Sequence, residues 1–155
     1  MVKTMPNPPK PQKKELSETQ EPQKLQEPQG LHEIPEAEVV TIQKKLSLFH
    51  EYWSPKIIGE LNDSHIKVAK LLGEFVWHDH QEEDEMFLVI KGKLLIKLRD
   101  RNLHLSAGDF VVIPKGVEHR PVAKSEVHVL LIEPKTTVNT GSVRERRTVV
   151  RSERI

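Results

Sequence analysis

Short hydrophobic runs separated by turn signals dominate the chain from residue 55 onward. Inside these runs the spacing is that of strands, and no helical periodicity of three to four residues separates one run from the next. Asn, Asp, Gly and Pro occupy the joints, where turns favour them. We expect strands over seven ranges: 56–61, 65–77, 85–91, 93–99, 102–105, 109–113 and 126–133.

Strands this short and closely spaced predict an all-β domain, built as an antiparallel sandwich or barrel. Gly73 lies alone inside the second run, where it indicates a bulge or a bend. Residues 37–53 carry a further apolar pattern, which is compatible with a strand that leads into one helical turn.

Composition divides the 155 residues into three parts. Residues 1–36 hold seven of the 11 prolines, mixed with Gln, Lys and Glu, so we expect a disordered arm that buries too little apolar surface to fold. Residues 37–142 form the expected single β-domain. Residues 143–155 carry five Arg against two Glu and form an expected solvated tail, because they lack the aromatic residues on which single-strand nucleic-acid binders stack bases.

Charge and cysteine content exclude several classes of protein. The net charge of +1 gives no general attraction to nucleic acid or to an anionic membrane. No stretch approaches the ~20 apolar residues of a membrane span, and the beginning of the chain lacks the apolar core of a secretory signal, so we expect a cytoplasmic protein. Without cysteine there is no disulfide, no thiolate zinc site and no cysteine nucleophile, which leaves histidine and carboxylate as the strong metal ligands.

Three histidines and one glutamate stand at spacings that suit a metal site. His78 and His80 are two residues apart, so on an extended segment both side chains point to the same face. Glu85 opens the next strand after a short polar connection, and His119 follows shortly after the strand over 109–113. Three imidazoles and a carboxylate converging inside a small barrel would make a divalent transition-metal site with positions left open for water or substrate.

The remaining polar residues have simpler interpretations. The acidic residues 82–84 fit a solvated turn. Five histidines have no partner ligand at a useful spacing, and we expect them to be ordinary surface or core residues: His32, His50, His65, His104 and His128.

The same spacing resembles the two sequence motifs of the cupin superfamily over residues 55–135. The positions of the first motif are filled by His78, His80, Glu85 and Gly92. The positions of the second motif are filled by Gly108, Pro114, Gly116 and His119. Two positions depart from the pattern without removing a ligand: the first glycine, Gly73, is one residue too close, and Ala123 replaces the final Asn.

The resemblance implies a double-stranded β-helix, the jelly-roll barrel of cupins, with a metal inside. By resemblance the metal ligands are His78, His80, Glu85 and His119, and the metal is Mn, Fe, Zn or Ni. The chain looks most like small single-domain cupins that are labelled mannose-6-phosphate isomerase-like. That label is a likeness to the cupin domain of larger enzymes, and a shared fold does not fix a reaction.

Three functions are compatible with this site. The first is a metalloenzyme that isomerises a small polar molecule, with a sugar as one candidate, and with Glu85 or a bound hydroxide as the base. A phosphate on such a substrate would need a fixed cation, although we expect the candidates to face solvent: Lys70, Lys91, Lys97 and Arg120. The second is an Fe(II)-dependent dioxygenase, with an apolar pocket for which the candidates are Phe87, Val89, Phe110 and Val112. The third is a non-catalytic module that binds a ligand.

A homodimer is also expected. Both alternating faces of the strand over 85–91 are apolar. One face can fill the barrel, while the other needs a second sheet or a second subunit.

Overall fold

The computed structural model describes residues 37–155. The predicted disordered arm, residues 1–36, lies outside the described residues. Within these residues the structure has one short helix and seven strands: α1 (Ile42–Leu46), β1 (Lys56–Leu61), β2 (Ser64–Glu74), β3 (Glu85–Lys91), β4 (Lys93–Leu98), β5 (Asn102–Ser106), β6 (Phe110–Ile113) and β7 (His119–Pro134). Within this part of the chain, no helix is long and apolar enough to cross a membrane.

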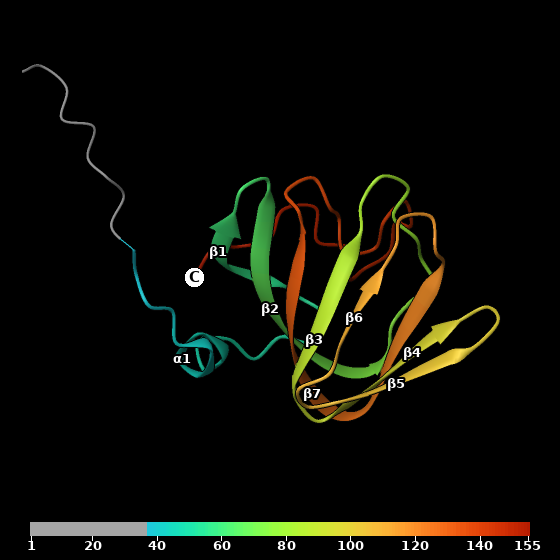
Figure 1. Ribbon diagram of the computed structural model, residues 1–155, viewed down its shortest axis with the longest axis horizontal. Coiled ribbons are helices and arrows are strands. Elements are labelled where there is room, and N and C mark those ends of the chain that lie inside the picture. Colours follow the sequence, from blue (N-terminus) through green and yellow to red (C-terminus); the bar gives the residue numbers. More distant parts are fainter. Residues whose placement is uncertain (1–36) are drawn as a thin grey trace, which may run out of the picture. The chain divides into compact units, whose positions relative to one another are not determined.

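The strands form an antiparallel β-barrel, as the sequence predicts (Figure 1). Along the main path of the sheet the order is β1-β2-β7-β3-β6, and β4 pairs with both β5 and β7. The long strand β7 is therefore shared, because it pairs with β2, β3 and β4. Residues at the beginning of β7 face β4, and residues near its end face β3.

Two strand boundaries differ from the sequence prediction by more than one residue. The second strand ends at Glu74 instead of residue 77, just after the predicted irregularity, where the register shifts and Gly73 takes a φ of +82°. The last strand begins at His119 instead of residue 126, and Pro121 lies inside it. The carbonyl oxygen of Pro121 accepts a hydrogen bond from the Phe75 amide, at 2.9 Å, so this proline contributes to the sheet as an acceptor.

Alternation along each strand separates the core from the outer face. On β3 the side chains of Glu85, Phe87 and Val89 are buried, whereas those between them are only half-buried. The core inside the barrel joins this face to inward residues of the other strands, among them Ala69, Leu71, Leu94, Ile96, Val129 and Leu131. Gly92 makes the tight turn from β3 to β4 possible, because a Cβ there would lie 2.9 Å from the Glu126 carbonyl oxygen and φ is +90°.

The segment before β1 supplies one helical turn and no strand. Helix α1 covers part of the outer face of the sheet, where Leu46 and Phe49 pack against Ile58 and Val68. The chain then crosses back toward the barrel through Trp53, which takes a φ of +61°.

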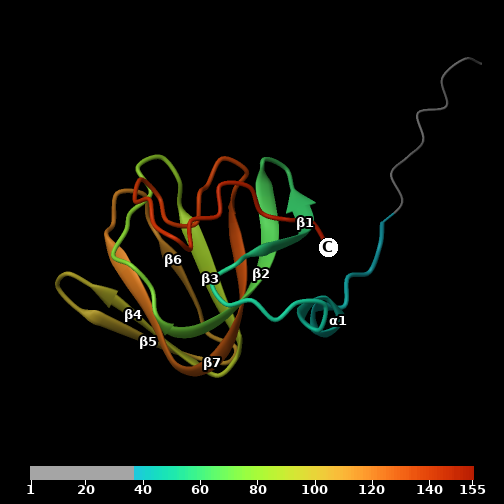
Figure 2. The ribbon, with the colours of Figure 1, turned by 180° about the vertical axis from the view of Figure 1, so that it is seen from behind.

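Residues 135–155 follow the domain surface instead of extending into solvent as the expected Arg-rich tail would. Figures 1 and 2 show this stretch running across one end of the barrel to β1. There the Ile57 amide donates to the Glu153 carbonyl oxygen at 2.8 Å, and the Ile155 amide donates to the Ile57 carbonyl oxygen at 3.1 Å. The side chain of Ile155 packs against the α1 cluster.

Candidate metal centre

The structure brings together the four residues that the sequence singles out as ligands. His78 and His80 lie on the connection between β2 and β3, Glu85 begins β3, and His119 begins β7. One ligand atom from each residue lies within 4.8 Å of the others. All four side chains are buried, and His119 is 0% exposed.

Backbone pairing holds the distant ligand segments together. The His78 amide donates to the His119 carbonyl oxygen at 3.1 Å, and the His119 amide donates back to the His78 carbonyl oxygen at 2.9 Å. The Gly116 amide donates to the His80 carbonyl oxygen at 2.7 Å. Each histidine of the H-x-H pair is thus fixed to the segment that carries the third histidine.

Hydrogen bonds set the tautomers of two imidazole rings. The Nδ1 atom of His78 lies 3.0 Å from the Val76 carbonyl oxygen, and the Nδ1 atom of His119 lies 3.0 Å from the Val117 carbonyl oxygen. A carbonyl oxygen only accepts, so Nδ1 carries the proton and Nε2 keeps its lone pair. This is the arrangement in which a histidine binds a metal through Nε2 while its other nitrogen is held by the protein.

Glu85 is the anion at the centre of the cluster. Its Oε2 lies 3.2 Å from His119 Nε2 and 3.3 Å from His80 Nε2. Burial would raise the pKa of Glu85, but its close contacts with His119 and His80 hold it well below its usual range, so the group is a carboxylate. Burial pushes down the pKa of His80, but the contact with Glu85 and its charge, together with the charges of Glu133 and Glu83, outweigh burial and raise it overall.

The donor set fits a divalent transition metal. His80 Nε2 is buried and has no well-aligned hydrogen-bond partner, although it faces Glu85. A buried polar atom without a partner is costly, and a bound cation would satisfy it. Three imidazole nitrogens and one carboxylate suit Mn, Fe, Zn or Ni, so the chemistry does not select one of these metals.

A small apolar cavity lies beside the cluster and is bordered by His78 and Glu85. Its volume is about 30 Å³, roughly that of one water molecule. Apart from the two ligands and Asn139, its walls are apolar: Trp53, Pro55, Ala69, Leu71, Phe75, Phe87, Pro121 and Leu131. Trp53 stacks on Phe75, with ring centroids 4.7 Å apart.

The expected pocket residues divide between two faces of the sheet. Phe87 lines the cavity and Val89 belongs to the core inside the barrel. Phe110 and Val112 do not line the cavity, because β6 pairs with β3 through Leu88↔Phe110 and Met86↔Val112, which places them on the outer face. Phe110 is 65% exposed and Val112 is 48% exposed.

The four cations considered for phosphate binding also lie away from the cavity walls. Lys70 donates to the Phe49 carbonyl oxygen at 2.7 Å, and Arg120 pairs with Glu74. Lys91 is exposed, and the Lys97 side chain is 35% exposed. Among residues 37–155, none of the side chains that line the cavity is Lys or Arg.

One buried ion pair inside the barrel was missed by the sequence interpretation. Lys67 Nζ lies 2.6 Å from Glu133 Oε1, and the two side chains are 3% and 1% exposed. Burial, followed by the negative charge of Glu85, raises the pKa of Glu133 to about 7, while Lys67 opposes this rise. Alternation did carry a signal, since Lys67 precedes the inward Ala69 and Leu71 at intervals of two residues.

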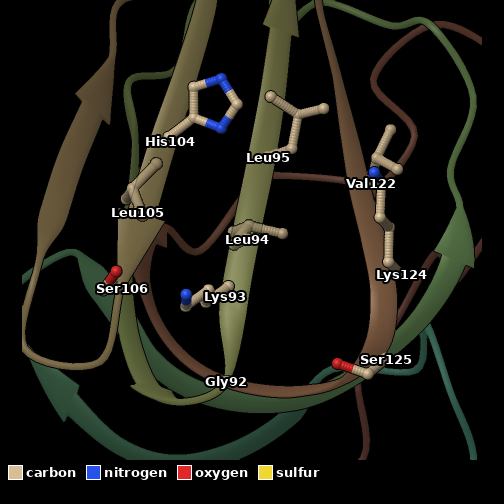
Figure 3. Close-up of a pocket in the computed structure, with 10 residues that line it drawn as sticks. All are labelled: Gly92, Lys93, Leu94, Leu95, His104, Leu105, Ser106, Val122, Lys124 and Ser125. Carbon is tan, nitrogen blue, oxygen red and sulfur yellow. The ribbon is translucent and has the colours of Figure 1, made fainter.

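A larger, open groove of about 640 Å³ lies on β4, β5 and β7, away from the four ligands (Figure 3). Lys93 and Lys124 stand on β4 and β7, and His104 stands on β5. All three are exposed, and His104 is thus an ordinary surface residue, one of the two alternatives that the sequence left open for it. The strands separate below the Leu95↔Val122 pair, the last pair on that side of β4, and this separation produces the groove.

Known proteins share both the sequence pattern and this architecture. A family model for the cupin domain matches residues 68–133. The crystal structure of a cupin-2 domain containing protein from Shewanella frigidimarina is 51% identical over 62% of this chain and 94% of that chain, with a TM-score of 0.61. This protein belongs to the cupin family.

Two further relatives extend the likeness. A crystal structure of a Neisseria meningitidis protein is 30% identical over 63% of this cupin and 99% of that chain, with a TM-score of 0.58. The uncharacterized protein YdbB of Bacillus subtilis is 44% identical over 64 residues, which are 41% of this cupin and 57% of YdbB. The match therefore spans less than two thirds of that relative.

Low pH is expected to destabilise the metal-free cupin through His78. Burial, and then the charge of His119, lowers the pKa of His78 from 6.5 to about 4. The unfolded chain binds more protons between these values, so this contribution to stability is lost as pH falls through the window, and it amounts to at most about 3 kcal/mol. Urea unfolding at pH 7 and pH 4 should show a larger loss for the natural protein than for a His78→Gln variant.

The variant is needed because Glu133 changes stability with pH in the opposite direction to His78. Glu133 is present in both proteins, so the difference between them reports on His78. The raised pKa of Glu133 adds stability at low pH that is lost as pH rises toward about 7. Equal pH dependence in the two proteins would show that His78 accepts a proton as readily in the folded state as in the unfolded chain.

Proposed function

We propose that this cupin holds a divalent transition metal through His78, His80, Glu85 and His119, and binds a small molecule at the metal, of which only one small group would enter the adjacent cavity. The observation that carries the proposal is the convergence of four buried donor atoms within 4.8 Å, at the wall of a cavity. A bound metal would supply Lewis acidity and open positions for a ligand. The metal would be Mn, Fe, Zn or Ni.

The protein's own residues would orient the ligand and exclude water. Trp53, Phe75 and Phe87 surround the cavity and favour an apolar part of the bound molecule. Glu85 borders both the cavity and the histidines, so we assign to its carboxylate the role of catalytic base, which accepts a proton from the ligand. The substrate class is a small polar molecule, with a sugar as one candidate, that presents its polar end to His78 and Glu85.

An Fe(II)-dependent dioxygenase is the second candidate, and the cavity wall favours it. Such an enzyme needs a largely apolar pocket beside its metal. The absence of Lys and Arg from the cavity walls within residues 37–155 argues against a substrate that carries a phosphate there. Iron in the purified protein together with substrate-dependent O₂ consumption would favour the oxygenase, and turnover without O₂ would favour the isomerase.

Replacing His80 with alanine is expected to lower metal content while the barrel stays folded. One of four donors would be lost, and its ring makes no hydrogen bond that the fold needs. Elemental analysis after reconstitution measures the effect, and circular dichroism checks the fold. His104→Ala is the matched control, since it removes an exposed imidazole from β5.

If the four residues are the metal ligands, the metal contents of the natural protein and the two variants should differ as follows. The natural protein and His104→Ala should bind about one metal ion per chain, whereas His80→Ala should bind much less. Natural protein without any transition metal after reconstitution would overturn the proposed function. Unchanged metal content in His80→Ala would instead show that the ligand set is wrong.

We also propose that the protein forms a homodimer through the outer face of β7, β3 and β6. The register places apolar residues side by side on this face: Met86, Leu88, Phe110, Val112, Leu130 and Ile132. β6 ends the main path of the sheet and carries the exposed Phe110 and Val112, so a second copy could cover them by presenting the same surface.

A Phe110→Glu variant is therefore expected to sediment as a monomer. The added carboxylate would have to be buried in the dimer without a partner, which is costly. Val150→Glu serves as the control, because Val150 is 70% exposed and lies after β7. A natural protein that sediments as a monomer at micromolar concentration would contradict the homodimer.

A further inference from the structure

Residues 139–149 lie against the loop that carries two of the proposed metal ligands. The loop leaves β2 at Glu74 and passes through His78 and His80 before β3 begins. Three residues of the later segment touch this loop or the cavity beside it, and each makes a different kind of contact: Asn139, Gly141 and Arg147.

Gly141 packs directly on the backbone between the two histidines. A Cβ at this position would overlap the Asp79 carbonyl oxygen and lie 2.9 Å from the Asp79 carbonyl carbon. The φ of Gly141 is +55°, which also favours glycine. Only a residue without a side chain allows this approach, so the outer side of the H-x-H turn is covered by backbone.

Arg147 contacts the beginning of the same loop. Its Nη1 donates to the Glu74 carbonyl oxygen at 2.8 Å, and its guanidinium carbon lies 4.8 Å from the centroid of the Phe75 ring. Phe75 in turn meets the His78 ring edge-to-face, with centroids 5.3 Å apart. The guanidinium is therefore two contacts away from a ligand ring.

Asn139 connects this segment to the wall of the cavity. Its Nδ2 donates to the Trp53 carbonyl oxygen at 3.3 Å and to the Arg147 carbonyl oxygen at 3.0 Å. Its Oδ1 accepts from the Val149 amide at 2.7 Å. Asn139 thereby links the backbone of Arg147 to the backbone of Trp53, which lines the cavity.

The segment has its own internal support. Thr140 is 0% exposed, and its Oγ1 lies 2.7 Å from the Val143 carbonyl oxygen and 2.9 Å from Thr148 Oγ1. The Glu145 carboxylate accepts from Arg147 Nε at 2.7 Å. These hydrogen bonds fix the conformation of the segment, so it packs against the loop as a rigid unit.

We propose that residues 139–149 form a clamp that positions His78 and His80 and thereby sets the metal affinity and ligand geometry of the site. Gly141 and Arg147 are positioning residues, since they act on the histidines through Asp79 and Phe75. The inference rests on the proposed metal-binding function, and it gives the Arg-rich end of the sequence a role at the metal centre.

The test uses Co²⁺ alone as the probe, with titration followed by the visible absorption of the bound ion. Arg147→Ala is expected to lower Co²⁺ affinity about tenfold, the size of effect typical of residues that orient metal ligands. Its absorption bands should also shift, because the ligand geometry changes. Arg147→Lys keeps a cation near Phe75 and should restore part of the affinity.

Arg146→Ala is the matched control, since Arg146 is exposed and adjacent in sequence. It should bind Co²⁺ with the affinity and spectrum of the natural protein. Gly141→Ala should change both quantities, and if it fails to fold, the Arg147 variants carry the test.

The outcomes separate the clamp from the metal site itself. Folded Arg147→Ala with natural affinity and an unchanged spectrum would overturn the clamp, even if its melting temperature fell. A natural protein that binds no Co²⁺ would instead overturn the proposed function. Lowered affinity with a shifted spectrum in Arg147→Ala, but not in Arg146→Ala, supports the clamp.

Discussion

A Lys67→Met variant is expected to lose about 3–5 kcal/mol of unfolding free energy at neutral pH and above. Lys67 and Glu133 form a buried ion pair with a 2.6 Å separation. Removal of the ammonium leaves a buried carboxylate without its cation, while Glu85 already adds a negative charge nearby. Urea denaturation monitored by circular dichroism measures the loss.

The loss should be smaller at pH 5 than at pH 8. The pKa of Glu133 is already raised to about 7, and removing Lys67 raises it further. At low pH the carboxyl group is therefore neutral in the folded variant, and the cost of burying a charge disappears. A loss that does not depend on pH would indicate that the missing packing of the Lys67 stem matters more than the charge.

A double variant, Lys67→Met with Glu133→Leu, is the control for the pair. Both charges are then replaced by apolar groups of similar size, and such replacements are often neutral or stabilising. The double variant should be more stable than Lys67→Met alone. If the second substitution adds its own loss instead, the ion pair contributes more to stability than the burial of its two charges costs.

The second large effect is expected for Trp53→Ala, with a loss of about 3–5 kcal/mol. Trp53 stacks on Phe75, and its Nε1 donates to the Leu72 carbonyl oxygen at 2.8 Å. Its removal would enlarge the cavity beside His78 and Glu85. Thermal unfolding measures the stability, and the rate at which a chelator removes bound metal measures access to the site.

Trp53→Phe separates the two roles of the indole. It keeps an aromatic ring against Phe75 but loses the Nε1 hydrogen bond, so its loss of stability should be smaller. The chelator should remove metal from Trp53→Ala faster than from Trp53→Phe. Equal rates in the natural protein and both variants would show that metal leaves by a route that does not pass Trp53.

The fold was largely predictable because the sequence repeats a local pattern. Alternation and turn residues marked the core of each strand, and the two motifs added the cupin topology. The beginning of β7 was missed because Pro121 resembles a strand breaker, whereas here it only accepts a hydrogen bond. The packing of residues 139–149 was missed because it depends on backbone bonds and on Gly141, which carry no hydrophobic signal.

In the candidate site, too, features set by neighbouring residues were predictable, whereas features set by strand pairing were not. His78 and His80 were identifiable because a spacing of two residues fixes their common face. The positions of Phe110 and Val112 depend on the pairing of β6 with β3, which alternation within one strand cannot supply. Lys67 was overlooked because a lysine in a strand is normally taken to face solvent, and its partner is 66 residues away.

The central place of β7 also affects how the protein can fold during synthesis. β2, β3 and β4 all pair with β7, which begins only at His119. Because a ribosome releases the chain from its N-terminal side, these strands emerge before their common partner and expose unpaired edges and apolar faces meanwhile. The barrel can therefore close only after β7 has emerged, and this closure also brings His119 to the other three ligands.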